Sequence, residues 1–293
     1  MRRSASSVSL STIGKQNGDL IRKAGTKLNR LGINFTRDAG LPAEEAFPLF
    51  SDLGFDAVFT EFFGTTALHE PYAEAAQRAG LYYECLHAPF GHINDIWSDG
   101  ASGDRMEKEL CDTVKAAAAF SVPYVVVHLS SGDHCPSIND TGHARFDRLI
   151  ECAVRNHVTV AFENQRKLAN LAFVMELYRD VPNVGFCWDV GHEKCFADGK
   201  EFVPLFGDRL VYTHIHDNLC EHNKDLHLIP FDGAIDYTRT AQHLKNFGGT
   251  LTLELLPLNS NRYTDISPRA YYTRAHDAAV RLRDLVSDAR NSR

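Results

Sequence analysis

The feature that most constrains the fold is a regular alternation of short apolar runs with longer amphipathic stretches. The apolar runs are rich in β-branched and aromatic residues, as strands buried on both faces are. We expect strands at residues 31–36, 56–61, 81–87, 124–129, 158–164, 184–189, 210–216 and 250–256. The stretches between them predict helices at residues 42–53, 70–79, 104–120, 142–156, 168–179, 200–207, 236–246 and 266–288.

Strands that alternate with helices indicate βαβ units and a parallel sheet. Eight of each is the count of a closed (β/α)₈ barrel, a fold that commonly takes about 250 residues. Neither glycine-rich nucleotide fingerprint, G-x-G-x-x-G or G-x-x-x-x-G-K-[ST], follows the early strands, which argues against an open doubly wound sheet. We therefore predict an α/β protein with one TIM-barrel domain at residues 27–290, after a polar, serine-rich leader at residues 1–26.

Composition excludes several other classes of protein. The chain contains no run of eighteen apolar residues, and its first residues lack the apolar segment of a secretory signal. Its seven cysteines are odd in number and form no C-x-x-C pair, which favours a reducing cytoplasm. A net charge of −7 argues against a basic surface for nucleic acid. We expect a cytoplasmic protein without a membrane partner.

Ligand-type side chains occur where the expected strands end. They are Glu61, His87, His128, Glu163, Asp189, His214 and Glu254. In a barrel the carboxyl ends of all strands meet at one face, where active sites are built. A glutamate inside the apolar run TLTLELL is especially informative, because burying an unpaired carboxylate costs several kcal/mol. We expect these side chains to converge.

Four of these residues have the donor types of a divalent metal site: Glu163, Asp189, His214 and Glu254. Oxygen ligands with one imidazole suit Mn²⁺, Mg²⁺, Co²⁺ or Zn²⁺ and leave positions open for a substrate. Five further residues are candidates for a second metal or for substrate contacts: His87, His128, His192, Asp225 and His227. We expect one ion, with room for up to three. The other histidines, His216 among them, are interpreted as peripheral.

Several segments resemble the xylose isomerase-like barrel superfamily of sugar isomerases, epimerases and endonuclease IV. They are HAPF (87–90), VVVHLSSG (125–132), AFEN (161–164), CWDVGH (187–192), THIHDN (213–218), DLHLIPFDG (225–233) and LELL (253–256). The resemblance to the epimerases implies one metal held by Glu163, Asp189, His214 and Glu254. It also implies that Glu163 and Glu254 move a proton between substrate carbons, beside a carbonyl that the metal polarises.

Endonuclease IV supplies the competing interpretation. The resemblance implies a trinuclear zinc site, and all nine of its ligand types have a positional match at His87, His128, Glu163, Asp189, His192, His214, Asp225, His227 and Glu254. Such a site suits hydrolysis of a phosphodiester. The simple ketose epimerases carry an arginine after the seventh strand, whereas THIHDNLCEHNKDLH contains none.

The loops favour a small substrate over nucleic acid. A DNA enzyme needs arginine and lysine across many phosphates, but FFGTTALHEP carries neither residue, and the loops after strands three and six are balanced or acidic. We therefore expect a metal-dependent isomerase or epimerase of a sugar, sugar phosphate or cyclitol, with Asn164, Arg166, Trp97 and Trp188 as substrate contacts. A multi-zinc phosphodiesterase, a non-catalytic metal-binding barrel and a homo-oligomeric state remain open alternatives.

Overall fold

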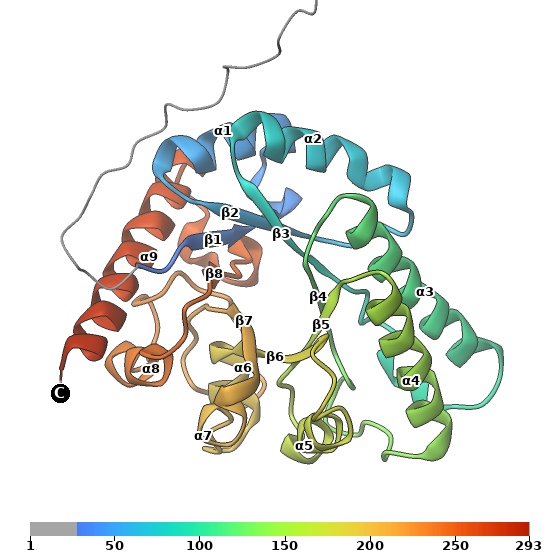
Figure 1. The fold of residues 1–293 in the computed structure, drawn as a ribbon. Helices are drawn as coiled ribbons and strands as arrows, with labels where there is room; N and C mark the ends of the chain where they lie inside the picture. Colours follow the sequence, from blue (N-terminus) through green and yellow to red (C-terminus); the bar gives the residue numbers. More distant parts are fainter. Residues whose placement is uncertain (1–27, 293) are drawn as a thin grey trace, which may run out of the picture.

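The computed structural model describes residues 28–292 as a ring of helices around a parallel sheet (Figure 1). The strands are β1 (Leu31–Asn34), β2 (Ala57–Glu61), β3 (Tyr82–His87), β4 (Tyr124–Val127), β5 (Thr159–Glu163), β6 (Val184–Asp189), β7 (Leu210–His214) and β8 (Leu251–Leu253). The leader expected at residues 1–26 lies outside the described residues. Within them, each strand lies inside a segment for which the apolar runs predict one.

The sheet is a nearly closed barrel. Its strands follow the order β7-β6-β5-β4-β3-β2-β1-β8, and all of the named pairings are parallel. An isolated parallel bridge between Ile215 and Leu253 joins the two end strands just beyond β7. The backbone N–H of Ile215 donates to Thr252 at 2.9 Å, and that of Glu254 donates to Ile215 at 3.1 Å. The predicted (β/α)₈ architecture is confirmed.

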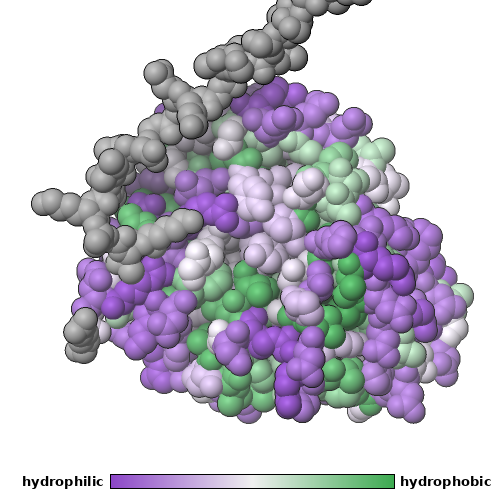
Figure 2. Space-filling view, in the orientation of Figure 1, coloured by the Kyte–Doolittle hydropathy of each residue, from purple (hydrophilic) through white to green (hydrophobic). Residues whose placement is uncertain are grey.

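Helices surround the strands and bury apolar faces against them (Figure 1). They are α1 (Ala43–Leu53), α2 (Glu70–Ala79), α3 (Ala101–Ala119), α4 (Asp140–Arg155), α5 (Leu168–Leu177), α6 (Val190–Phe196), α7 (Val203–Phe206), α8 (Tyr237–Leu244) and α9 (Pro268–Asn291). Figure 2 shows hydrophilic side chains along the solvent side of α3 and α4, and hydrophobic ones nearer the centre of this face. Helices α3 and α4 are therefore amphipathic, as their sequence periodicity predicts.

One helix differs from the expectation. The segment 200–207 forms only the single turn α7, whereas α6 begins directly after β6 at Val190. The cause lies at the start of α6, where the Asp189 side chain caps the helix by accepting the backbone N–H of His192 at 2.6 Å. Because the helix begins directly at the strand end, His192 follows Asp189 by three residues and is buried.

The barrel interior is filled by its own small apolar layer. This inner layer consists of Phe59, Cys85, Val126, Ala161, Cys187 and Tyr212, one residue from each of six strands. Side chains on a strand alternate between its two faces, so residues two positions further along point into the barrel again. Those positions are Glu61, His87, His128, Glu163, Asp189 and His214. The polar residues at the strand ends therefore form the next layer above an apolar floor.

Candidate metal centre

Four of the converging side chains form a compact donor set. The metal-binding atoms of Glu163, Asp189, His214 and Glu254 all lie within 4.8 Å of one another. Nδ1 of His214 is 2.9 Å from Oε1 of Glu163 and 3.3 Å from Oε2 of Glu254. The first three side chains are essentially inaccessible to solvent, whereas Glu254 is partly exposed. We call these four residues the central set.

A second donor set shares Glu163 with the central set. Nε2 of His128 lies 2.6 Å from Oε2 of Glu163, and Nε2 of His87 lies 3.4 Å from the same oxygen. Nδ1–H of His87 donates to the backbone carbonyl of Ala88 at 2.8 Å, which turns Nε2 toward the carboxylate. These three residues, His87, His128 and Glu163, are the first flanking set.

A third donor set consists of His192, His216, Asp225 and His227. Oδ2 of Asp225 is 3.2 Å from Nε2 of His192 and 3.1 Å from Nε2 of His227. Nδ1–H of His227 donates to the backbone carbonyl of Glu254 at 3.0 Å, so its other nitrogen faces the aspartate. We call these residues the second flanking set.

The electrostatics of the donors reflect opposite charges packed together. Burial alone would raise the pKa of Glu163, but the neighbouring His214 and His128 outweigh it and hold that pKa well below its usual range. Burial opposes protonation of His87 and His227, yet Glu163 and Asp225 respectively raise their pKa values to about 9. Burial lowers the pKa of His128 despite the same glutamate. The Glu163 carboxylate is therefore held ionised, as a metal ligand must be.

Several donor atoms are buried without a hydrogen-bond partner among residues 28–292. They include Oδ2 of Asp189, Nε2 of His214, Oδ1 of Asp225 and both ring nitrogens of His216. A buried polar atom that makes no hydrogen bond costs about 1–3 kcal/mol. This concentration of buried, unpaired donor atoms fits a bound cation, which would supply the missing interaction. The buried His, Glu and Asp clusters are thus consistent with divalent metal binding.

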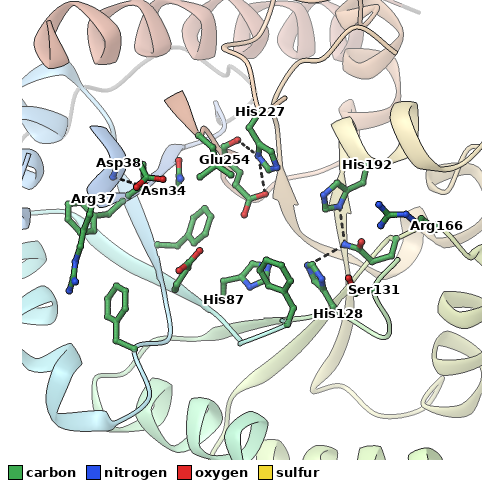
Figure 3. Close-up of a pocket in the computed structure, with 18 residues that line it drawn as sticks. Asn34, Arg37, Asp38, His87, His128, Ser131, Arg166, His192, His227 and Glu254 are labelled. Carbon is green, nitrogen blue, oxygen red and sulfur yellow. Dashed lines mark hydrogen bonds and ion pairs between the residues drawn. The ribbon is translucent and has the colours of Figure 1, made fainter. Parts of the chain in front are cut away.

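A cavity of about 660 Å³ opens above these donors (Figure 3). His87, His128, His192, His227 and Glu254 line it, whereas Glu163, Asp189 and His214 lie beneath its surface. Its wall also carries two arginines and four phenylalanines, which are Phe35, Phe59, Phe63 and Phe90. Arg37 and Arg166 lie on opposite sides of the cavity in Figure 3. A sugar-sized molecule would fit between the arginines and the donors.

The expected substrate contacts divide into one that lines this cavity and three that do not. Arg166 lines it, held by Asp133 at 3.0 Å and packed over the ring of Phe196. Asn164 does not line the cavity, and both ends of its amide bind the backbone of Asp189. Of the four expected contacts, Arg166 alone lines the cavity, and its contact with a substrate stays a prediction.

The two tryptophans expected as substrate contacts also lie away from the cavity. Trp97 and Trp188 are buried in the hydrophobic core and do not line the cavity. The indole N–H of Trp97 donates to the backbone of Leu129, and that of Trp188 donates to Glu193. Because both donors are already used inside the protein, these side chains pack the barrel and its helices. The aromatic part of the cavity wall comes from Phe35, Phe59, Phe63 and Phe90.

Several residues of the site went unrecognised in the sequence, among them Arg37 on the cavity wall and two residues beside the donors. His216, interpreted there as peripheral, is fully buried in the second flanking set. Its signal was the i, i+2 spacing from His214, which keeps two side chains on the same face of an extended chain. Gln165 lines the cavity, and its Nε2 lies 3.2 Å from Nε2 of His128 and 3.0 Å from Nδ1 of His192. No pattern in the sequence distinguishes Gln165.

The chain belongs to the xylose isomerase-like TIM barrel family, whose model matches residues 47–273. It is 34% identical over 199 residues to the uncharacterized protein y4fM of Sinorhizobium fredii, an alignment covering 62% of this chain and 61% of that one. It is 31% identical over 157 residues to a probable endonuclease 4 of Haloquadratum walsbyi, covering 45% and 53% respectively. The chain thus spans between half and two thirds of these relatives.

A solved structure shares the barrel at low sequence identity. A D-tagatose 3-epimerase-like protein superposes with a TM-score of 0.68 at 18% identity, covering 88% of this chain and 98% of that one. At this identity the likeness concerns the fold alone. Separately, none of the helices within residues 28–292 combines the length and the apolar character needed to cross a membrane.

Proposed function

We propose that the protein is a metal-dependent isomerase or epimerase that transfers a proton next to a carbonyl of a sugar or cyclitol. The observation that carries the proposal is the central set lying directly beneath a sugar-sized cavity, with one of its carboxylates, Glu254, on the cavity wall. A divalent cation bound there would polarise the substrate carbonyl and make the neighbouring C–H more acidic. Protein side chains would then bind the cation, accept the proton and hold the substrate.

Glu254 is the side chain best placed to accept the proton. It combines exposure to the cavity with a position only 3.3 Å from His214, so it can both face a substrate and hold an ion. Glu163, the other glutamate expected to act in acid–base chemistry, is buried below the cavity and its oxygens face His128, His87 and His214. We therefore assign Glu163 to metal binding and Glu254 to proton transfer.

The remaining wall suits a polyhydroxylated substrate. Phe63 and Phe90 offer apolar ring surfaces to the C–H groups of a sugar, while Gln165 and Arg166 offer hydrogen-bond donors. Arg166 would bind a hydroxyl or an anionic group without changing its orientation, because Asp133 and Asn223 already hold its guanidinium. We also place the protein in the cytoplasm, since all seven of its cysteines are free.

A second candidate is hydrolysis of a phosphate ester. The observation that favours it is the presence of both flanking sets beside the central one, which allows more than one ion to contact a phosphate. The relative named as a probable endonuclease 4 points the same way. The cavity lining carries Arg37 and Arg166 but also Asp38, Glu61 and Glu254, so a small ester suits it better than a DNA duplex.

One set of assays decides between the two candidates. Protein reconstituted separately with Mn²⁺, Co²⁺, Mg²⁺ and Zn²⁺ is incubated in D₂O with a panel of keto-sugars and keto-cyclitols, and deuterium uptake is followed by NMR. The same preparations are assayed with bis-p-nitrophenyl phosphate and with DNA carrying an abasic site. Deuterium uptake at a carbon next to the carbonyl supports the isomerase. Ester cleavage without any uptake overturns it in favour of the hydrolase.

A further inference from the structure

We propose that the substrate is a glycoside, whose reacting sugar lies above the metal donors and whose second sugar ring lies in a neighbouring cavity beyond Arg37. This inference rests on the proposed function, because it names the substrate class of the same site. The observation behind it is a cavity of about 770 Å³ that none of the roles assigned above uses. We call it the outer cavity, and the cavity above the donors the donor cavity.

The outer cavity lies between the segments that follow β1 and β2. Leu41 and Glu44 contribute to its wall from the β1–α1 connection and the first turn of α1. Ala67, Leu68 and Tyr72 contribute from the turn after β2 and from α2. The segments that follow the strands form the face of a barrel on which substrates bind. The outer cavity therefore opens on the same face of the protein as the donors.

The two cavities meet along three side chains. Phe35, Arg37 and Phe63 line both of them. Phe35 is buried, whereas Arg37 is exposed, so the junction is open to solvent at the arginine. Figure 3 shows Arg37 at the edge of the donor cavity, on the side away from Arg166. A molecule longer than one sugar ring can therefore extend from the donors across Arg37 into the outer cavity.

Arg37 is oriented at this junction but keeps hydrogen-bonding capacity. Its Nη2 donates to the Tyr72 hydroxyl at 2.7 Å, and its guanidinium carbon lies 5.0 Å from the centre of the Phe63 ring. No carboxylate among residues 28–292 forms an ion pair with it, whereas Arg166 pairs with Asp133 at 3.0 Å. Because a guanidinium has five N–H groups in a fixed plane, Arg37 can still donate to the oxygens of a bound sugar.

The wall of the outer cavity suits the apolar face of a sugar ring. The Tyr72 ring lies 5.6 Å from that of Phe35 and 5.0 Å from that of Phe63, measured between ring centres. Leu68 adds an apolar side chain that is 53% exposed. A bound ring would cover these apolar surfaces with its C–H groups, while Arg37 binds its hydroxyls.

The charges of the outer cavity favour a neutral sugar over a phosphate group. Arg78 lines this cavity but already pairs with Glu74 at 3.1 Å. The remaining charged residues of the lining are Arg37 and Glu44, which carry opposite charges. The cavity thus lacks the excess of positive charge that attracts a phosphate. Its occupant is therefore the second sugar of a glycoside.

The first test compares ketose disaccharides with a free ketose. Metal-reconstituted protein is incubated in D₂O with lactulose, isomaltulose or fructose, and kcat/KM for deuterium uptake is measured. We expect at least one disaccharide to exceed fructose by about tenfold or more, because the second ring adds binding energy. Ala67→Trp places a large side chain at an exposed position of the outer wall and should remove this advantage, mainly by raising KM for the disaccharide.

Two further variants complete this comparison. Arg37→Gln should also raise KM for the disaccharide more than KM for fructose. Ala67→Ser, which leaves the outer cavity open, is the matched control and should behave like the wild type with both sugars.

A second test measures binding without turnover. Lactitol contains a galactose ring but no carbonyl in its other half, so it cannot undergo the reaction. In saturation-transfer NMR with the metal-loaded protein, both halves of lactitol should receive saturation. Ala67→Trp should reduce the signal of the galactose ring relative to that of the other half, whereas Ala67→Ser should not.

Equal kcat/KM for fructose and both disaccharides in the wild type would overturn the inference, and so would lactitol that receives no saturation in its galactose ring. Deuterium uptake with fructose would still support the proposed function in either case. Absence of uptake with every ketose, together with saturation of both halves of lactitol that Ala67→Trp reduces, would overturn the proposed function and support the outer cavity as a sugar-binding site. The two proposals therefore fail separately.

Discussion

The amide of Asn164 clamps the backbone of Asp189 from both sides. Oδ1 of Asn164 accepts the N–H of Asp189 at 2.8 Å, and its Nδ2 donates to the carbonyl of the same residue at 2.9 Å. The two residues directly follow β5 and end β6, and both are fully buried. This pair of hydrogen bonds sets the spacing between Glu163 and Asp189, two carboxylates of the central set.

Removing the clamp should destabilise the protein. Asn164→Ala leaves a buried N–H and a buried carbonyl unpaired, at about 1–3 kcal/mol for each group. Asn164→Asp keeps the hydrogen-bond acceptor and loses the donor, so its free energy of unfolding should lie between those of the wild type and Asn164→Ala. The free energy of unfolding, measured by urea titration of metal-free protein, checks the order. The control Asn246→Ala, at an exposed position, should change the free energy of unfolding by less than about 0.5 kcal/mol. Equal stability of Asn164→Ala and the wild type would contradict the prediction.

Glu254→Gln should abolish proton transfer while leaving metal in place. The amide oxygen can still face an ion, but it cannot accept a proton, and general-base catalysis typically contributes about 10²–10⁴-fold. The rate of deuterium uptake should fall by that factor, with a metal content close to that of the wild type. Asp38→Asn, another carboxylate on the cavity wall, is the matched control and should retain activity within a few-fold. Full activity in Glu254→Gln would remove Glu254 from this role.

Removing metal with a chelator should lower the unfolding temperature. An ion that binds only the folded protein stabilises it by about 2.7 kcal/mol when its free concentration is 100 times its dissociation constant. The midpoint of thermal unfolding should therefore rise with each tenfold increase in added metal. The variant Asp189→Ala lacks a ligand of the central set, so its unfolding midpoint should rise less with added metal. Superimposable unfolding curves with and without metal would exclude tight binding.

His69 should make the stability depend on pH. Its buried ring accepts the N–H of Phe63 at 3.0 Å and contacts the Tyr83 hydroxyl at 3.2 Å, and burial lowers its pKa from 6.5 to about 4. The unfolded chain therefore binds the proton first as the pH falls. The stability that neutral His69 contributes is complete above pH 6.5 and is lost progressively toward pH 4.

A variant that cannot titrate at this position isolates the effect. His69→Gln should be less stable than the wild type at pH 7.5, and the gap in unfolding free energy should narrow as the pH falls to 4.5. Metal-free proteins are compared by urea unfolding, so that release of ions does not contribute. His222→Gln, at an exposed site, should give a curve parallel to that of the wild type. A gap for His69→Gln that is constant with pH would refute the prediction.

Most of the barrel could be predicted because its signals are local. Each strand is a continuous apolar run in the sequence, and a polar residue at the end of such a run is easily recognised. Glu163 and Glu254 were recognisable in this way, since a carboxylate in an apolar strand needs a reason to be buried. The positions of the two tryptophans could not be predicted, because a large aromatic side chain near a strand end can face either the cavity or the helices. The direction depends on packing partners such as Leu129 and Glu193.

The sequence by itself determined the architecture and the layer of ligand-type residues, because strand periodicity and burial act over a few residues. Only the tertiary structure decided which members of that layer have their donor atoms within 4.8 Å of one another. Asp225 and His216 are nine residues apart in the chain, yet their side chains meet because the loop after β7 returns to the barrel. It also decided that Glu254 faces the cavity while Glu163 lies beneath it. Distances of a few ångströms between separate strand ends are set by barrel closure, and no local pattern encodes them.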